Sequence, residues 1–371
     1  MEYRKLPKGN ELINPIGIGL GAFENISEVE IEKILNKAID NGINFFDICA
    51  GKKNVYAPFG RAIKNRREQV YFEIHFGAVY NENGDYGWSR DLEVIKNTFQ
   101  WEMQVLGTDY ADFGFLHCID DENDLNDVIN NGILDYVLDL KKNNIIRHLG
   151  FSSHTPAICN KLLDMKIFDL FLFSINPAYD YEVGDEYGIG TLHERIELMK
   201  RAVKEEVGIS VMKPYFGGKL LSKDHSPFNE SLTVINCLQY AIDRPGVVAV
   251  CPGINSMEQL DEILDYYKAS NKDKDYSIIS NLKKTILLNT CVYCRHCQPC
   301  PVGIDIALVN KYYDLSLVGD KIATNHYSKL QVNASHCIEC GYCDSRCPFN
   351  IRQSQKMKVI NEYFNKQKTL I

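Results

Sequence analysis

The chain has 371 residues and a formal net charge of −8, with 45% hydrophobic and 24% charged residues. This composition is that of an ordinary globular protein, and the acidic balance argues against a broad nucleic-acid-binding surface. No apolar run is long enough to span a bilayer, and the first residues lack the apolar core of a signal peptide. We therefore expect a cytoplasmic protein that binds neither nucleic acid nor membrane.

Residues 1–275 alternate short apolar runs with amphipathic stretches. The predicted strands are Ile16–Leu20, Asn44–Ile48, Val70–His75, Ala111–His117, His148–Ser152, Leu170–Asn176, Gly208–Lys213 and Val247–Cys251. Helical patterns follow them, as at Glu28–Asn41, Asp91–Leu106, Leu125–Asn143, Leu192–Glu206, Leu232–Asp243 and Met257–Tyr267. Eight such units in about 270 residues predict an α/β fold of the (β/α)8 TIM-barrel type. A doubly wound open sheet is the alternative, but the glycines after the first strand lack the spacing of its phosphate turn.

Polar side chains stand where the predicted strands end. They are Asp47, His75, His117, Ser152, Asn176, Lys213 and Cys251. In a TIM barrel the chemistry lies at the C-terminal ends of the strands, so these residues are candidates for a site. Two long loops, Gly77–Trp88 and Pro177–Gly190, carry several tyrosines and acidic residues and are candidates for a lid over it.

Residues 276–371 are predicted to form a second, small and mostly helical domain. Helical patterns occur at Asp305–Leu317, Lys321–Leu330 and Ser354–Lys366. Eight of the thirteen cysteines fall in two runs here. The second run, Cys337-x2-Cys340-x2-Cys343-x3-Cys347 followed by proline, has the bacterial ferredoxin spacing, and the first, Cys291-x2-Cys294-x2-Cys297-x2-Cys300, is one residue shorter.

The cysteine runs predict two [4Fe–4S] clusters. In this pattern the last cysteine of each run reaches across to the other cluster. One cluster is then predicted on Cys291, Cys294, Cys297 and Cys347, and the other on Cys337, Cys340, Cys343 and Cys300. The alternative is a pair of structural zinc sites, which also use four cysteines but do not need the repeated triplet.

Together these motifs resemble the aldo-keto reductase family, in its bacterial branch with a C-terminal ferredoxin-type domain. Gly42–Asp47 is similar to the segment that holds the family's catalytic aspartate, and Asp112–His117 to the strand that ends in the catalytic histidine. Gly150–His154 resembles the strand that meets the nicotinamide amide. The resemblance implies a TIM barrel and an oxidoreductase that acts on a small carbonyl or hydroxyl substrate.

The resemblance fails at two catalytic positions. The family uses an aspartate, a proton-donating tyrosine, a lysine and a histidine. The corresponding set here reads Asp47, Lys52, His75 and His117, and Tyr56 lies four residues beyond the tyrosine position. We expect His75 or His117 to be the general acid, with Lys52 as electrostatic support. The alternative is that the barrel has lost the ancestral chemistry.

The resemblance also implies where a nicotinamide dinucleotide would bind. The matching positions are Ser152, Ser153, Asn176, Lys213, Gly217, Gly218, Pro252, Gly253, Ser256 and Gln259. Val247–Tyr267 contains several acidic residues and no lysine or arginine, which disfavours the 2′-phosphate of NADPH and leaves NAD(H) as the expected nicotinamide. A flavin stays an open alternative, because linking one-electron clusters to a hydride carrier normally needs such an intermediary.

Three functions are therefore open. The first is a nicotinamide-dependent carbonyl or polyol oxidoreductase with accessory clusters. The second is a reductase without nicotinamide, fed through the clusters by ferredoxin or another electron carrier. The third is a lyase, an isomerase or a binding protein without redox chemistry.

Overall fold

The computed structural model describes residues 3–181, 187–281, 291, 293, 296–317, 321–347 and 351–368. Cys294, the proline after Cys347 and part of the second predicted loop lie outside the described residues. Within those ranges, no helix combines the length and the apolar character needed to cross a membrane.

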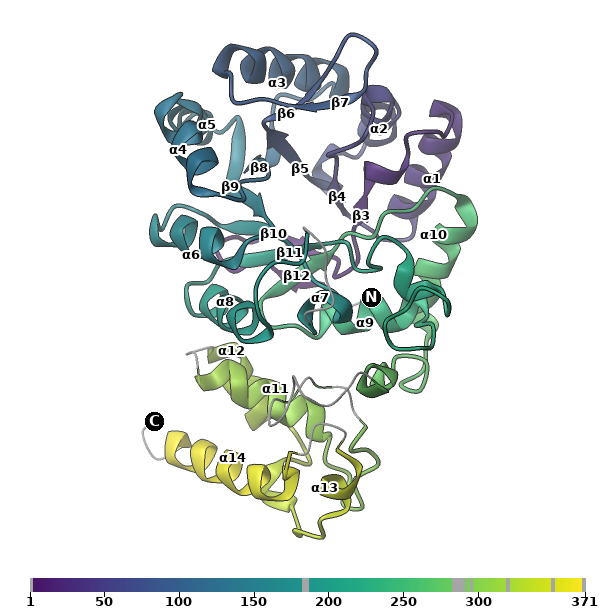
Figure 1. Cartoon of the computed structure of the whole chain (residues 1–371), viewed down its shortest axis with the longest axis vertical. Coiled ribbons are helices and arrows are strands. Elements are labelled where there is room, and N and C mark those ends of the chain that lie inside the picture. Colours follow the sequence, from purple (N-terminus) through teal and green to yellow (C-terminus); the bar gives the residue numbers. More distant parts are fainter. Residues whose placement is uncertain are drawn as a thin grey trace.

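The core of the fold is a closed parallel barrel (Figure 1). Its strands are β3 Ile18–Gly19, β4 Phe45–Asp47, β5 Tyr71–Phe76, β8 Ala111–Leu116, β9 Ile146–Ser153, β10 Leu170–Ser174, β11 Gly208–Met212 and β12 Val247–Val250. They pair in that order, and parallel bridges from Ile16 to Val250 and from Gly19 to Gly253 close the ring. The predicted TIM barrel is thus confirmed, and the open doubly wound sheet is excluded.

Amphipathic helices surround the barrel. Their bounds are α1 Glu28–Asp40, α2 Tyr56–Ile63, α3 Leu92–Leu106, α4 Glu122–Asn130, α5 Ile133–Lys142, α6 Pro156–Asp164, α7 Pro177–Asp180, α8 Leu192–Lys204, α9 Val234–Ile242 and α10 Met257–Leu264. Side chains cap several of them, as Ser27 does for α1 and Asp91 for α3. The single helix predicted over Leu125–Asn143 is wrong: Gly132, at φ +75°, separates α4 from α5, because a left-handed residue cannot continue a helix.

Two hairpins lie at opposite ends of the barrel. At the N-terminal end, β1 Arg4–Lys5 pairs with β2 Leu12–Ile13, and Leu6 and Ile13 pack beneath the barrel interior with Phe113 and Leu170. At the other end, the predicted loop Gly77–Trp88 is a hairpin of β6 Ala78–Tyr80 and β7 Tyr86–Trp88, which is antiparallel and pairs Tyr80 with Tyr86. The hairpin gives these aromatic side chains fixed positions near the mouth.

The described C-terminal residues add four helices on one side of the barrel (Figure 1). These are α11 Ile306–Leu317, α12 Lys321–Ser328, α13 Tyr342–Arg346 and α14 Gln353–Lys368. They share a separate apolar core that includes Val309, Tyr327, Ile360 and Phe364. The hydroxyl of Tyr276 bonds both Asp243 of the α9 end and the carbonyl of Tyr293, which attaches this part to the barrel.

Candidate active site at the barrel mouth

Four polar side chains form a continuous row at the C-terminal mouth. Asp47 ends β4, His75 lies near the end of β5, His117 follows β8, and Tyr86 begins β7. Oδ1 of Asp47 lies 3.2 Å from Nε2 of His75, and the Nδ1 atoms of His75 and His117 are 3.1 Å apart. Nε2 of His117 lies 2.7 Å from the hydroxyl of Tyr86. The structure thus brings together three predicted catalytic residues and adds a phenol that the family comparison had not supplied.

Lys52, the residue at the family's tyrosine position, is not part of this row. Its side chain is 43% exposed and lies 3.8 Å from Asp85. The backbone around it instead pairs with the hairpin, through a bridge between Lys52 and Asp85 and a 2.8 Å bond from the Tyr86 amide to the Gly51 carbonyl. The segment that carries a phenol in the family therefore docks the hairpin that carries Tyr86. The only sequence signal for Tyr86 was the tyrosine content of its predicted loop.

Tyr56, the other candidate phenol, is buried away from the row. Its hydroxyl donates to Glu102 at 2.7 Å and lies 3.1 Å from the hydroxyl of Tyr80, which in turn bonds the backbone of Ala50. Burial raises the pKa of Glu102 to about 8. This group supports the loop after Asp47, and the hydrogen bonds of Tyr56 go to Tyr80 and Glu102 instead of to the row.

Two members of the row, His117 and Tyr86, are neutral at pH 7. Burial, reinforced by the neighbouring His75, lowers the pKa of His117 well below its usual value, so its ring is neutral. Burial raises the pKa of the Tyr86 phenol, which keeps its proton. Below the row, burial and the nearby Asp47 raise the pKa of Glu73 well above its usual value, and this carboxyl accepts a hydrogen bond from Ser210. These shifts leave a phenol held by a neutral imidazole, an arrangement suited to proton transfer.

A second polar group lies beside the row. Nδ1 of His154 is 2.8 Å from Asp120, and the thiol of Cys118 donates to the same carboxylate at 3.4 Å. Burial alone would raise the pKa of Asp120, but the hydrogen bonds from His154 bring it down to about 2. Nζ of Lys213 is 3.5 Å from Nε2 of His154 and 2.9 Å from the ring centre of Tyr187. This group places a cation and an anion side by side at the rim.

The residues predicted to meet a nicotinamide amide are engaged inside the protein. Asn176 is fully buried; its Oδ1 accepts from the amide of Tyr179, and its Nδ2 donates to the carbonyl of Lys213. Oγ of Ser152 accepts from the amide of Cys118 at 2.7 Å. Ser153 donates to Asp120. These polar atoms contact neighbouring residues of the protein, and we derive no step through a nicotinamide at this end of the predicted site.

The predicted phosphate end is more open. Gly217 and Gly218 have φ of +62° and +86°, and a side chain at either position would meet no atom within 4 Å. Ser256 caps α10, and Gln259 accepts from the amide of Asn255 at 2.7 Å. Pro252 and Gly253 serve the closure of the barrel, where the Pro252 carbonyl accepts from Gly19. The open backbone lies at the glycines, while the two polar side chains are used by the protein.

The described cysteines of the two runs are free thiols, and the second predicted set lines one cavity. Cys300, Cys337, Cys340 and Cys343 surround it, and apolar side chains such as Ile304 and Met357 complete its walls. Cys291 and Cys347, two members of the other predicted set, pack together against the barrel core, with Nε2 of Gln353 3.8 Å from the Cys291 sulfur. Four thiols around an apolar cavity form a donor set that fits an iron–sulfur cluster.

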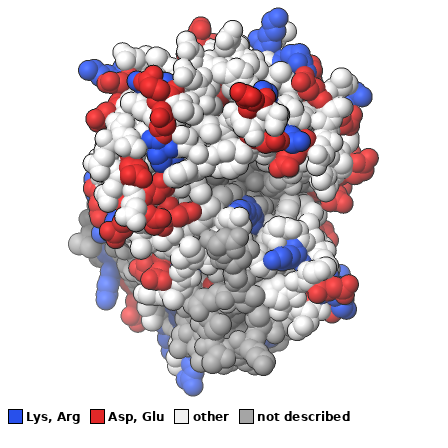
Figure 2. Space-filling view, turned by 45° about the horizontal axis from the view of Figure 1, so that its top comes forward, with Lys and Arg blue, Asp and Glu red and all other residues white. Residues whose placement is uncertain are grey.

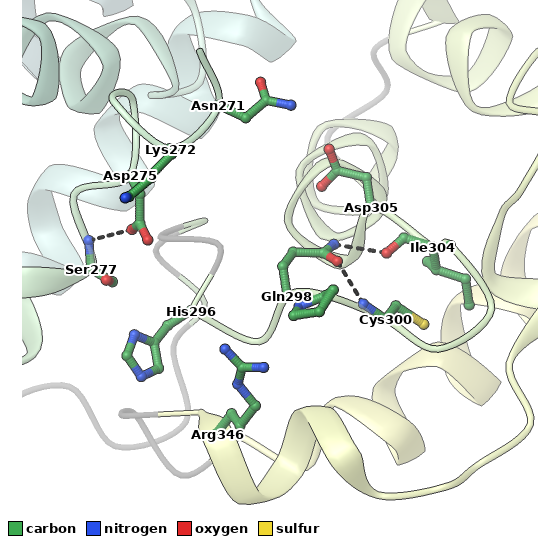
Figure 3. A pocket seen from close by; sticks show the side chains of 12 residues that line it. Asn271, Lys272, Asp275, Ser277, His296, Gln298, Cys300, Ile304, Asp305 and Arg346 are labelled. Carbon is green, nitrogen blue, oxygen red and sulfur yellow. Dashed lines mark hydrogen bonds between the residues drawn. The ribbon is translucent and has the colours of Figure 1, made fainter.

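A further cavity of about 610 Å³ lies between the barrel and the first cysteine run (Figure 3). Lys272 and Arg346 line it together with Asp275 and Asp305, so neither sign of charge prevails. Figure 2 shows one face of the molecule, on which acidic and basic side chains are interspersed and acidic ones gather along one flank. The charges that line the cavity favour neither an anionic nor a cationic ligand.

This chain has a closed parallel barrel with acid–base side chains at the C-terminal ends of its strands, which is the arrangement of TIM-barrel enzymes. The sequence profile of the aldo/keto reductase family matches residues 15–231, so the chain belongs to that family, and it is an oxidoreductase of the aldo/keto reductase type. No curated protein sequence shows significant similarity to it.

Solved structures show the same fold. The holo form of an aldo-keto reductase from Bacillus halodurans has a TM-score of 0.61 at 20% identity, covering 76% of this chain and 97% of its own. A putative aldo-keto reductase from Pseudomonas aeruginosa reaches 0.55 at 20% identity, covering 72% and 95%. An aldo/keto reductase from Klebsiella pneumoniae in complex with NADP and acetate reaches 0.52 at 15% identity, covering 73% and 92%. At these identities the likeness shows the fold alone.

Proposed function

We propose that this chain reduces a small carbonyl substrate at the barrel mouth, with Tyr86 as the proton donor and with electrons that arrive through its C-terminal domain. The observation that carries the proposal is the 2.7 Å contact between the Tyr86 hydroxyl and Nε2 of His117. It restores a phenol to a barrel whose sequence has lysine at the family's tyrosine position. The phenol comes from the β6–β7 hairpin instead of the segment after β4.

The reduction of a carbonyl to an alcohol consumes two electrons and two protons. Tyr86 donates one proton to the carbonyl oxygen as charge develops there, and solvent supplies the other to carbon. The neutral ring of His117 orients the phenol and shares its proton. Asp47 and His75 stand behind His117 and hold its orientation through the 3.2 and 3.1 Å contacts of the row. In the reverse direction the same groups would accept a proton from an alcohol.

The electrons are assigned to two [4Fe–4S] clusters on the eight predicted cysteines. When bound, such clusters supply electrons one at a time. The cavity lined by Cys300, Cys337, Cys340 and Cys343 supports the crossed ligation of one of them. Cys291 and Cys347 pack against the barrel core, which would put the other cluster nearer the barrel. A ferredoxin-type carrier is the expected electron donor. Anaerobically purified protein should contain about eight irons and as many sulfides per chain, whereas zinc without sulfide would refute this assignment.

The test of the active site is the variant Tyr86→Phe. A reduced viologen would serve as the one-electron donor, and a panel of small aldehydes and ketones as acceptors, under anaerobic conditions. Loss of a general acid should lower kcat by about 10²–10⁴-fold with little change in KM, at unchanged iron content. Trp88→Phe, two residues along the same strand, is the matched control and should keep its activity. Equal activity in both variants would remove Tyr86 from the mechanism.

A nicotinamide-linked reaction is the second candidate function. The open backbone at Gly217 and Gly218 favours it, because it leaves room for a dinucleotide phosphate. Dithionite-reduced protein should be titrated separately with NAD+ and NADP+. Saturable binding of either nucleotide would support this candidate, whereas no binding together with cluster reoxidation by a carbonyl substrate would support the first.

A further inference from the structure

The mouth of the barrel holds three metal-ligating side chains in one place. Cys49, His75 and His117 each offer a ligand atom, and these atoms all lie within 4.8 Å of one another. Both histidines are buried, and Cys49 is partly exposed. The Cys49 amide donates to Asp47 at 3.0 Å, which ties the cysteine to the row. A cysteine sulfur and two imidazole nitrogens form a donor set that suits a divalent transition ion once the thiol has lost its proton to the metal.

The two histidines face each other through their Nδ1 atoms, and two unprotonated nitrogens at this distance would repel unless a proton or a cation lay between them. Asp47, next to Nε2 of His75, is an acceptor and favours a proton on that nitrogen, which leaves Nδ1 of His75 as a lone pair. That Nε2 is buried, and among the described residues no acceptor meets hydrogen-bond geometry with it. Nδ1 of His75 points at Nδ1 of His117 across 3.1 Å. Either a proton on His117 or a cation must lie between the two atoms.

The geometry is that of two ligands on one tetrahedral ion. Zinc–nitrogen bonds of about 2.0–2.1 Å at a tetrahedral angle place two nitrogens about 3.3 Å apart, close to the separation seen here. A cation between the Nδ1 atoms would leave both Nε2 atoms protonated. In that form the N–H of His117 would donate to the Tyr86 oxygen and leave the phenol proton for the substrate, in place of the phenol-to-imidazole bond of the metal-free protein. The N–H of His75 would lie 3.2 Å from Asp47, outside hydrogen-bond geometry in this structure.

The neighbouring group of Cys118, Asp120 and His154 has a similar composition but is already satisfied. Its carboxylate accepts hydrogen bonds from the thiol, from Nδ1 of His154 and from Ser153. A metal there would displace two of these protons. The group of Cys49, His75 and His117 is the better one, because its ligand atoms are not already held by a carboxylate and its two Nδ1 atoms contact each other at 3.1 Å.

We propose that Cys49, His75 and His117 bind one divalent ion of the zinc type, with a fourth position open toward the mouth. Three protein ligands and an open position are the arrangement of catalytic zinc sites, in which the ion polarises an oxygen of the substrate or a water. A catalytic role for the ion rests on the proposed carbonyl reduction, whereas the binding of the ion does not depend on that proposal. The ion would take over the electrostatic part of the family's missing tyrosine–lysine pair.

The test measures zinc and iron together on the full chain. Anaerobically purified protein is treated with a chelator, incubated with Zn²⁺ alone and analysed by elemental mass spectrometry and zinc-edge X-ray absorption. We expect about one zinc per chain beyond the cluster iron, with two nitrogens at about 2.0–2.1 Å and one sulfur at about 2.3 Å. An ion surrounded by sulfur only would lie in the cluster cysteines and would refute the site.

Variants separate this site from other thiols. Cys49→Ala should abolish tight zinc binding at unchanged iron, and Asp47→Asn, which alters only an outer partner, should weaken it about 10–100-fold. Cys159→Ala, which removes a buried thiol of α6, is the control and should keep zinc. Retention of zinc by Cys49→Ala, or no zinc in the parent protein, would overturn the inference. If zinc is absent while Tyr86→Phe still abolishes turnover, the metal alone is refuted; if zinc binds but no carbonyl is reduced, the proposed function alone is refuted.

Discussion

The buried carboxyl of Glu102 makes the stability of the barrel depend on pH near neutrality. Glu102 is 2% exposed and accepts a hydrogen bond from Tyr56, and burial raises its pKa from 4.5 to about 8. The folded protein therefore keeps this proton up to pH 8, while the unfolded chain loses it near pH 4.5. The folded state binds more protons between these values, so stability falls as pH rises through this window.

The size of the effect follows from the shift. Relative to a neutral side chain, the carboxyl destabilises the fold by about 1 kcal/mol at pH 5 and about 4 kcal/mol at pH 8. Glu102→Gln removes this term but places an amide N–H in a buried position, at a cost of about 1 kcal/mol at either pH. The variant should thus match the parent at pH 5 and be about 3 kcal/mol more stable at pH 8. For a domain of this size that corresponds to a rise in Tm of about 5–6 °C.

Thermal unfolding followed by circular dichroism, at pH 5 and pH 8 under anaerobic conditions, measures this difference. Glu93→Gln is the matched control, because Glu93 lies on the same helix but is exposed and pairs with Lys96 at 2.8 Å. Its Tm difference from the parent should be equal at the two pH values. If Glu102→Gln also shifts Tm equally at both, the carboxyl titrates as in the unfolded chain, and its burial does not have the assigned consequence.

Three further variants test other parts of the mouth. Arg90→Ala leaves Asp124 without its buried partner at 2.6 Å and should destabilise the protein by about 3–5 kcal/mol, so that a Tm within 1 °C of the parent would contradict the geometry. Lys52→Ala removes only an exposed ion pair with Asp85 and should change kcat/KM by less than about threefold, whereas a hundredfold loss would make Lys52 catalytic. Asn176→Ala removes a helix cap and leaves a buried carbonyl unpaired, so it should cost about 2–3 kcal/mol in thermal unfolding. A change in nucleotide affinity without a loss of Tm would instead make Asn176 a cofactor residue.

The barrel was predictable because its signals are local. Each strand is a short apolar run whose neighbours along the chain are also its neighbours in the sheet, so eight repeats indicate the ring without long-range information. The error at Leu125–Asn143 has an equally local cause. The apolar period continues through Gly132, and only its left-handed backbone separates the helices.

The site was harder to predict because its decisive contacts are long-range. Asp47, His75 and His117 were found from strand ends, which must meet at one face of a barrel. Tyr86 was not assigned a catalytic role, because its position depends on the pairing of residues 51–53 with residues 84–86. Sequence spacing shows that Lys52 stands where the family has tyrosine. It does not show that the backbone of residues 51–53 pairs with the hairpin that carries Tyr86.

Asn176 shows a second limit of sequence comparison, in which the position is identified but the bonding of its side chain is not. A resemblance identifies the position but not what the side chain bonds, and here both ends of its amide are used by the protein's own backbone. A side chain that caps a helix and holds the chain after β11 cannot also turn toward a ligand without releasing one of these groups. The same reasoning favours Cys49, His75 and His117 as a place for new chemistry, since their ligand atoms lie within 4.8 Å of one another and the two Nδ1 atoms contact each other instead of the backbone. The departure from the family at His75 thus coincides with a group of possible metal ligands, and the metal analysis of Cys49→Ala tests whether that group binds an ion.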